Sequence, residues 1–404
     1  MAFYITSVLG AGVLVVPGLA AQVAGPGSIL AWLLVSAASY PFAYTFASLS
    51  SRNPESGGIY SFAKEAFGDR EATVIAWLFL AWVIMGAPAI SLAAGSYIAA
   101  SVPLTRTETF IAAAVLLLIA YAVNYRGIRF SSRVQLVTVA VIIAVVSFAV
   151  ITSASRVSPS NFTPFLPNGP ASIGVAAALV VWSYLGYENA SNVAEEFKDP
   201  KRDFNRSVAI SFIIVSVLYL AVATVTVGTA SYRAGGGVVP FSSLMTSTLG
   251  TAGGVVVSAL AVVIIFGTVN AYTGGMARIV YAAARDGGFP RALAKVDQRT
   301  GVPKRSLVAL LAVIMASLVF FYLLNFSIES AFIATSGAAL LTYVIGSAAG
   351  IKLLREKGAR RLLPIASLVV ALAILPFIGA LLGLSLAVAL GGVTYHWWRS
   401  RSKA

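Results

Sequence analysis

The sequence predicts an all-α integral membrane protein with twelve transmembrane helices. Hydrophobic residues make up 59% of the 404 positions and charged residues only 10%, whereas soluble domains average about 45–50% and about 25%. The mean hydropathy is +0.89. Apolar runs of about 20 residues, the helical length that crosses ~30 Å of hydrocarbon, recur along the whole chain. They lack the short alternating pattern of a transmembrane β-barrel.

The predicted spans leave little chain over for a soluble domain. Each is long enough to bond its own backbone groups as a helix, which the bilayer requires. They cover residues 3–24, 27–50, 72–100, 107–125, 134–154, 172–193, 207–230, 252–283, 306–324, 329–350, 362–378 and 379–397.

The net charge of +14 reflects topology, and we expect no nucleic-acid partner. Of the 28 Lys and Arg residues, 25 fall in alternate connections or the C-terminal tail, and only Arg106, Arg156 and Arg233 fall on the other side. Because cytoplasmic loops carry the excess of basic residues, both termini are predicted to be cytoplasmic. A multi-pass protein of the cell membrane is expected, with anionic membrane lipid touching its basic loops.

Catalytic chemistry and metal binding lack their usual residues. The chain has no cysteine and one histidine, His396, which ends the last span beside two tryptophans where interfacial residues belong. No phosphate-binding loop is present, which argues against an ATP-driven pump. We therefore expect neither an enzyme, a cofactor nor a metal site. The first span lacks a charged n-region and a cleavage site, which indicates a retained helix.

Two predicted spans carry glycines that interrupt a simple membrane helix. Span 1 contains Gly10 and Gly12, with Pro17 following, and span 6 contains Gly186. Broken helices at membrane depth persist where the freed backbone groups line a cavity or meet a ligand. The two spans lie five apart, so they occupy equivalent places in two inverted halves, which is typical of a transporter site. The alternative is that these glycines only allow close helix packing.

The helix ends would supply opposite partial charges. The outer half of span 1 would begin near Gly12 and present amide groups suited to a carboxylate. The outer half of span 6 would end near Trp182 and Ser183 and present carbonyl groups suited to an ammonium group. Together these ends predict a site for a zwitterion.

Glu188 is the only acidic residue in the interior of a predicted span, and it follows the glycine break of span 6. Burial raises the pKa of a carboxyl group, so such a residue can carry a proton near neutral pH. The alternative is a structural carboxylic acid that hydrogen-bonds to backbone freed by the break.

Four stretches, in order, resemble the amino acid–polyamine–organocation (APC) superfamily of transporters. They are Gly10-Ala-Gly-Val-Leu-Val-Val-Pro-Gly18, Pro54-Glu-Ser-Gly-Gly-Ile-Tyr60 with Ala66-Phe-Gly68, Trp182-Ser-Tyr-Leu-Gly-Tyr-Glu188 with the run to Arg206, and Ala277 to Pro290. The resemblance implies a LeuT-type fold, in which helices 1–5 (1–154) and 6–10 (172–350) form inverted repeats and helices 1 and 6 are discontinuous. Helices 11 and 12 (362–397) are peripheral.

The resemblance also implies site residues. The substrate carboxylate would meet the backbone of Gly10, Ala11 and Gly12, and the amine would meet the backbone of helix 6. Aromatic residues would line or gate the pocket, although core packing is the alternative for them. The helix-6 positions are Trp182, Ser183 and Leu185, the second aromatic position is Tyr272, and Gly186 and Glu188 would form a hinge or a proton-responsive switch.

The ion that drives transport and the class of substrate are inferred from the charged side chains inside the spans. Some family members carry a helix-5 lysine where this chain has Ile142, so a lysine-based proton mechanism is not expected. With Glu188 as the only acid in the span interiors, a neutral substrate follows by elimination. The best match is the group that exports neutral, aliphatic or methionine-like amino acids. We expect proton-coupled export or exchange, with sodium coupling and uncoupled exchange as alternatives.

Three further expectations concern gating, function and assembly. Arg278, Arg285 and Asp286, near the cytoplasmic end of span 8, could close an inner gate. The alternative functions are an exchanger or importer of other amino acids or polyamines, and a membrane amino-acid sensor without net transport. The protein would act as a monomer or a homodimer.

Overall fold

The computed structural model describes residues 8–52, 58–127, 132–186, 200–233, 235–354, 356 and 358–401, with backbone alone at 132–136, 138 and 200–208. These ranges are helical with intervening turns and contain no strand. Nine helices in them are long and apolar enough to cross a membrane. The prediction of an all-helical membrane protein is therefore confirmed.

The helices overlap the predicted spans, and the count of twelve spans stays a prediction. Their bounds are α2 (Gly12–Ala24), α3 (Ser28–Arg52), α4 (Gly58–Phe67), α5 (Asp69–Ala99), α6 (Arg106–Tyr125), α7 (Ser132–Ser153), α8 (Ala171–Ser183), α9 (Pro200–Gly228), α10 (Pro240–Asp286), α11 (Lys304–Leu324), α12 (Ile328–Leu353), α13 (Leu362–Ile374) and α14 (Leu382–Arg401). Short 3-10 turns cover Gly25–Gly27, Ala154–Arg156, Pro159–Phe162, Arg291–Leu293, Gly358–Arg361 and Leu375–Leu381.

α10 differs from its predicted span in a way that follows from glycine and proline. α10 begins at Pro240, twelve residues before the predicted span, and is kinked at Gly250, whose φ is 75°. Proline is favourable in the first turn of a helix because it has no N–H to leave unpaired there. α4 is an additional short helix in the segment predicted to connect spans 2 and 3.

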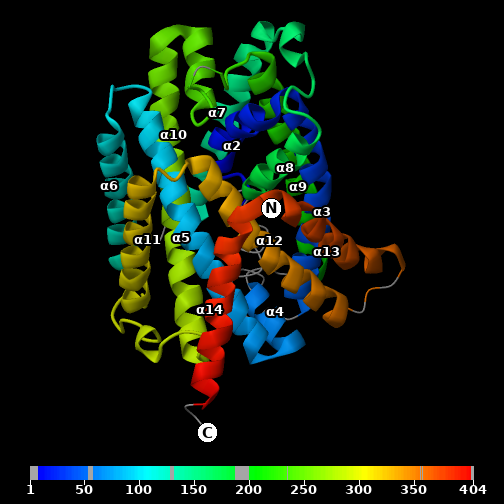
Figure 1. The fold of residues 1–404 in the computed structure, drawn as a ribbon, viewed down its shortest axis with the longest axis vertical. Helices are drawn as coiled ribbons and strands as arrows, with labels where there is room; N and C mark the ends of the chain where they lie inside the picture. The colour runs from blue at the N-terminus through cyan, green and yellow to red at the C-terminus, as the bar shows by residue number, and fades with distance from the viewer. Residues whose placement is uncertain are drawn as a thin grey trace.

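Most long helices run along one axis, as Figure 1 shows. α5 and α12 are buried along most of their length, whereas α6, α11, α13 and α14 have only a minority of their residues buried. Large side chains such as Trp32, Phe46 and Tyr219 are fully buried in the interior. Because exposed apolar surface on a membrane protein faces lipid, the outer helices form the lipid-facing wall.

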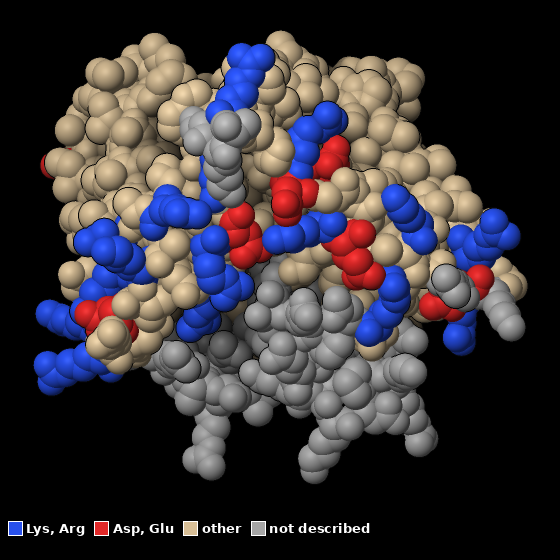
Figure 2. Space-filling model, turned by 90° about the horizontal axis from the view of Figure 1, so that it is seen from below, with Lys and Arg blue, Asp and Glu red and all other residues tan. Residues whose placement is uncertain are grey.

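Charged residues gather at one end of the bundle. We call it the basic end; it holds α4, the C-terminal end of α10 and the end of α14 (Figure 1). Figure 2 views this face, where Lys and Arg side chains surround a few Asp and Glu side chains. Arg106, Arg156 and Arg233 follow helices that run away from this end, so they lie at the opposite end of the bundle. This asymmetry agrees with the one read from the sequence.

Candidate functional site

The start of α2 and the end of α8, where the two helix breaks are predicted, lie against each other in the interior. α2 begins at Gly12, after bends at Leu9 and Gly10, and α8 ends at Ser183. A Cβ atom on Gly12 would lie 3.1 Å from the Cα atom of Ser183 and 3.0 Å from its Oγ atom. Only glycine allows this approach without displacement of the α8 backbone.

Gly186 completes the turn that follows α8. Its φ is 130°, in the region that L-residues with a side chain rarely adopt. The glycine is therefore required by the backbone here, in addition to any packing role. Glu188, the predicted proton-responsive residue, lies outside the described residues.

The hydroxyl of Tyr219 on α9 connects the two breaks. It donates to the carbonyl oxygen of Val8 at 2.8 Å and to that of Ser183 at 2.9 Å. A phenol has one hydrogen, so these two bonds share a single proton. Two carbonyl groups, one just before α2 and one at the end of α8, therefore share one neutral donor. A ligand group with several N–H donors would give each carbonyl its own hydrogen bond.

Buried polar atoms beside the breaks lack partners. The Oγ atom of Ser183 and the Nε1 atom of Trp32 are both buried and have no hydrogen-bond partner among the described residues. The ring of Trp32 packs edge-on against that of Tyr219, with centroids 5.1 Å apart. Since buried polar atoms in folded proteins are nearly always hydrogen-bonded, these atoms favour a polar ligand or water at this place.

α10 contacts the break in α2 through Thr268. The Oγ1 atom of Thr268 accepts a hydrogen bond from the amide of Ala11 at 3.2 Å, and the amide of Gly10 donates to the carbonyl of Val8 at 2.9 Å. Two of the three amides predicted to hold a carboxylate are thus occupied by protein atoms in this conformation. A carboxylate would have to replace Thr268 at the Ala11 amide.

The predicted aromatic positions, Trp182 and Tyr272, differ in their surroundings. Trp182 stacks on Phe332 of α12, with centroids 4.5 Å apart and an interplanar angle of 24°. A Cβ atom on Gly86 of α5 would lie 2.8 Å from the Trp182 ring, so α5 is in close contact as well. Leu185 is buried, and Tyr272 on α10 is half-buried.

A cluster of charged side chains ties α4 to the end of α10 at the basic end. We call it the Asp286 cluster; it consists of Tyr60, Lys64, Asp69, Arg285 and Asp286. The Lys64 Nζ atom lies 3.0 Å from Asp286 Oδ2 and 3.4 Å from Asp69 Oδ1, and the Arg285 Nε atom lies 3.6 Å from Asp286 Oδ1. The Tyr60 hydroxyl donates to Asp286 at 3.4 Å.

The Asp286 cluster contains two of the three predicted gate residues, Arg285 and Asp286, while Arg278 lies earlier on α10. Hydrogen bonding to Asp286 raises the pKa of Lys64 above its ordinary value. Burial, and next the negative charge of Asp286, raise the pKa of Tyr60. Both groups therefore keep their protons near neutral pH, and the cluster holds α4 against α10.

A second set of contacts ties α4 to α12. Arg52 pairs with Glu65 at 2.9 Å and also donates to the carbonyl of Leu353 at 3.0 Å. Lys352 donates to the carbonyl of Ala66 at 2.7 Å. α4 therefore bridges α10 and α12 at the basic end.

Sequence reasoning did not identify Tyr219, Thr268 or Lys64. Thr268 lies one helical turn before Tyr272, so the same helix face was available as a signal. Tyr219 is a tyrosine within an apolar span, where its hydroxyl needs a partner, and that was a weaker signal.

The architecture and the site define a polytopic membrane protein in which backbone carbonyls before α2 and at the end of α8 meet in the buried interior. The chain matches the profile of the amino acid permease family over residues 1–395, and it belongs to that family.

Relatives of known name agree with this class. The chain is 30% identical to the uncharacterized amino acid permease YecA of Bacillus subtilis, over 88% of this chain and 84% of YecA. It is 28% identical to the L-methionine/branched-chain amino acid exporter YjeH of Escherichia coli, over 93% and 89% of the two chains. It is also 28% identical to the branched-chain amino acid permease BcaP of Bacillus subtilis, over 74% and 68%. These names are those of transporters, which fits the expectation of transport rather than catalysis.

Proposed function

We propose that this protein is a secondary active transporter of a neutral amino acid, aliphatic or methionine-like, that works by alternating access around the two helix breaks. The observation that carries the proposal is the convergence of the Val8 and Ser183 carbonyls on the Tyr219 hydroxyl, beside the N-terminus of α2. The names of YjeH and BcaP support the substrate class.

Each part of an amino acid has a complementary group in this proposal. The ammonium group replaces the Tyr219 hydroxyl at the two carbonyls and gives each its own N–H donor. The carboxylate binds at the start of α2, where the amide groups and the helix dipole favour negative charge. The described residues at the breaks, from Val8 to Gly12 and from Ser183 to Gly186, carry no charged side chain, so a neutral substrate side chain is favoured.

The two helices, α2 and α8, also define the repeat organisation that we propose for the whole chain. α2 and α8 belong to the first helices of two inverted repeats, 1–154 and 172–350, in a protein with twelve spans whose last two, 362–397, lie outside the repeats. The Asp286 cluster and the α4 contacts to α12 close the path at the basic end. By the positive-inside rule this end is cytoplasmic, and the protein lies in the cell membrane with both termini inside.

The transport is proposed to be coupled to protons and directed outward. Glu188 follows Gly186 in the sequence, and it is the one acidic residue in the interior of a predicted span. Ile142, at the position of the helix-5 lysine of some family members, is buried on α7, which leaves Glu188 as the proton carrier. The exporter name of YjeH supports the outward direction.

Flux measurements in liposomes test transport and coupling separately. Purified protein should exchange radiolabelled L-methionine or L-leucine, unlabelled lysine and putrescine should not compete, and the flux should depend on pH. Glu188→Gln should remove the pH dependence, whereas Glu71→Gln in the first turn of α5 should not. Flux indifferent to pH and to Glu188→Gln would contradict proton coupling. Binding without flux in sealed vesicles would instead favour the sensor.

A further inference from the structure

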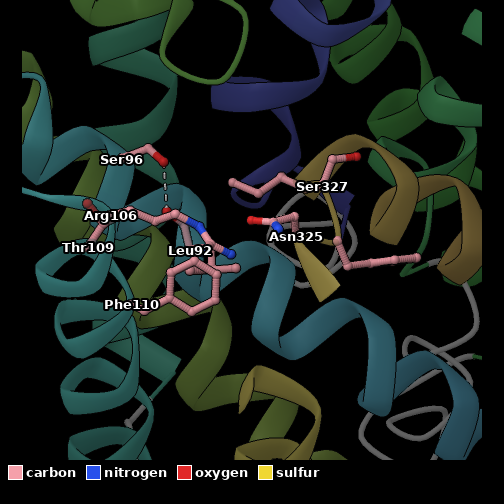
Figure 3. Close-up of a pocket in the computed structure, with 9 residues that line it drawn as sticks. Leu92, Ser96, Arg106, Thr109, Phe110, Asn325 and Ser327 are labelled. Carbon is pink, nitrogen blue, oxygen red and sulfur yellow. Dashed lines mark hydrogen bonds between the residues drawn. The ribbon is translucent and has the colours of Figure 1, made fainter. Parts of the chain in front are cut away.

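A cavity of about 250 Å³ lies at the end of the bundle opposite the basic end. It lies between the last turns of α5, the first turn of α6 and the turn from α11 to α12, as Figure 3 shows. Its polar lining comes from Ser96, Arg106, Thr109, Asn325 and Ser327. We call it the Arg106 cavity. It is separate from the helix breaks, and none of the proposed site residues lines it.

Arg106 brings a positive charge to this cavity without an acidic partner. No carboxylate lies within ion-pair distance of it in the described part of the chain, and the nearby Glu108 is bonded to Thr105. The guanidinium carbon lies 4.5 Å from the centre of the Tyr322 ring and 5.2 Å from that of Phe110. One nitrogen donates to the Tyr322 carbonyl.

This packing orients the guanidinium group but leaves most of its donors for a ligand. Aromatic contacts use the faces of the group, whereas its N–H donors point outward in its plane. One of the five N–H donors is used by the Tyr322 carbonyl. The remaining fork matches the geometry of a phosphate group.

The hydroxyl groups in the cavity are suited to accept hydrogen bonds. The Ser96 hydroxyl donates to the carbonyl of Leu92 at 2.9 Å, and the Thr109 hydroxyl donates to that of Thr105 at 3.0 Å. Their hydrogens are thus used, and their oxygen lone pairs can take donors from a ligand. The lining therefore complements an anion that also carries hydroxyl groups.

Apolar surface continues from the cavity along the bundle wall. Ile111 on α6 is 56% exposed, and Leu323 and Leu324 at the end of α11 are 69% and 61% exposed. Arg106 begins α6, so it lies where the helices meet the membrane surface. A phosphate held by Arg106 would therefore sit at headgroup depth, with acyl chains lying against α6 and α11.

We propose that the Arg106 cavity binds an anionic phospholipid with a hydroxylated headgroup, of the phosphatidylglycerol type. Arg106 holds the phosphate diester, and the glycerol hydroxyls of the headgroup donate to the Ser96 and Thr109 oxygens. The planar fork of N–H donors in an arginine side chain matches the oxygens of such a phosphate. The proposal is independent of the transported substrate.

Native mass spectrometry of the detergent-purified protein tests this site with defined lipids. Dioleoylphosphatidylglycerol should be retained in preference to dioleoylphosphatidylcholine, whose choline group cancels the phosphate charge and carries no hydroxyl donor. Arg106→Gln should lower that preference about tenfold, the effect expected from loss of a charge-assisted hydrogen bond. Arg233→Gln is the matched control: Arg233 lies at the same end, over the Tyr232 ring, but does not line the cavity.

A second variant keeps the test valid if Arg106→Gln folds poorly. Ser96→Phe fills the cavity and leaves Arg106 in place, and it should lower the preference for phosphatidylglycerol as well. Equal retention of the two lipids, or an equal loss in Arg233→Gln, would overturn the proposal. Displacement of the bound lipid by equimolar inorganic phosphate would assign the cavity to a soluble anion and would also overturn it.

Discussion

The paired helix breaks and the Asp286 cluster are both polar contacts between distant segments, yet they use different chemistry. At the breaks, backbone carbonyls meet the neutral hydroxyl of Tyr219, and all the atoms are buried. At the basic end, Lys64 and Asp286 meet as charged groups, with 41% and 25% of their side chains exposed.

The cost of removing charge from water explains this difference. A buried charge costs several kcal/mol or more unless it is paired, whereas dipoles from interrupted helices supply partial charge without an ion. Exposed ion pairs contribute only about 0.2–1 kcal/mol, so they can break and reform as the protein moves. The interior is thus suited to selective binding, and the basic end is suited to reversible closure.

The largest loss of flux is expected when a side chain at position 12 fills the space between the start of α2 and the end of α8. Gly12→Val places side-chain atoms against the Ser183 backbone, where a Cβ atom alone would lie 3.1 Å from the Cα atom. Overpacking of this kind costs about 1–3 kcal/mol. Amino-acid flux in liposomes should fall about tenfold or more at equal amounts of protein.

Gly275→Val on α10 is the control for that variant. A Cβ atom on Gly275 meets nothing within 4 Å, so its flux should stay within about twofold of wild type. Equal losses of flux in both variants would show that glycines in these helices are sensitive in general. That result would contradict a special role for the close contact between Gly12 and Ser183.

A smaller effect is expected from loosening the Asp286 cluster. Asp286→Asn weakens the bridge between α4 and α10, so the path from the basic end should open more often. Because the chain has no cysteine, Ser183→Cys provides a single label site at the breaks. An impermeant maleimide should label it about two- to fivefold faster in Asp286→Asn, the range expected for an exposed pair.

The dependence of the labelling difference on salt and pH distinguishes the Asp286 cluster from the uncharged contacts in the interior. The pKa of Lys64 is raised, so its stabilising contribution is present below the ordinary value of 10.5 and is lost as the pH rises through the raised pKa. The labelling difference should therefore stay constant between pH 6 and 8 and shrink at high salt. Glu71→Gln, which removes a pair between the neighbouring residues Arg70 and Glu71, should leave labelling unchanged; a matching increase there would contradict the gate.

The sequence was sufficient to locate the start of α2 and the end of α8, because the cause of each is local. Glycines in an apolar run indicated interruptions near Gly12 and Ser183, and the helices begin and end there. The charge asymmetry was also a local property of the connections. The start of α10 at Pro240 was missed, although proline at the first helical position was a usable signal.

The partners at the breaks could not be predicted in the same way. Tyr219 and Thr268 reach the breaks only because α9 and α10 pack beside α2 and α8, and no pattern within either helix specifies that contact. The bridge from Lys64 to Asp286 joins residues more than 200 positions apart. Such pairings depend on tertiary packing, which a single sequence does not reveal.

Thermal unfolding of Tyr219→Phe tests the central claim that the carbonyls at the breaks hold an ammonium group. Without the hydroxyl, the Val8 and Ser183 carbonyls lose a donor, at a cost of about 1–3 kcal/mol for a buried group, so the ligand-free midpoint should fall. L-methionine should stabilise this variant more than wild type, and N-acetyl-L-methionine, which lacks the ammonium group, should stabilise neither. Tyr281→Phe, on the half-buried face of α10, should behave as wild type. Equal stabilisation by the two ligands, or an unchanged midpoint in Tyr219→Phe, would contradict the account.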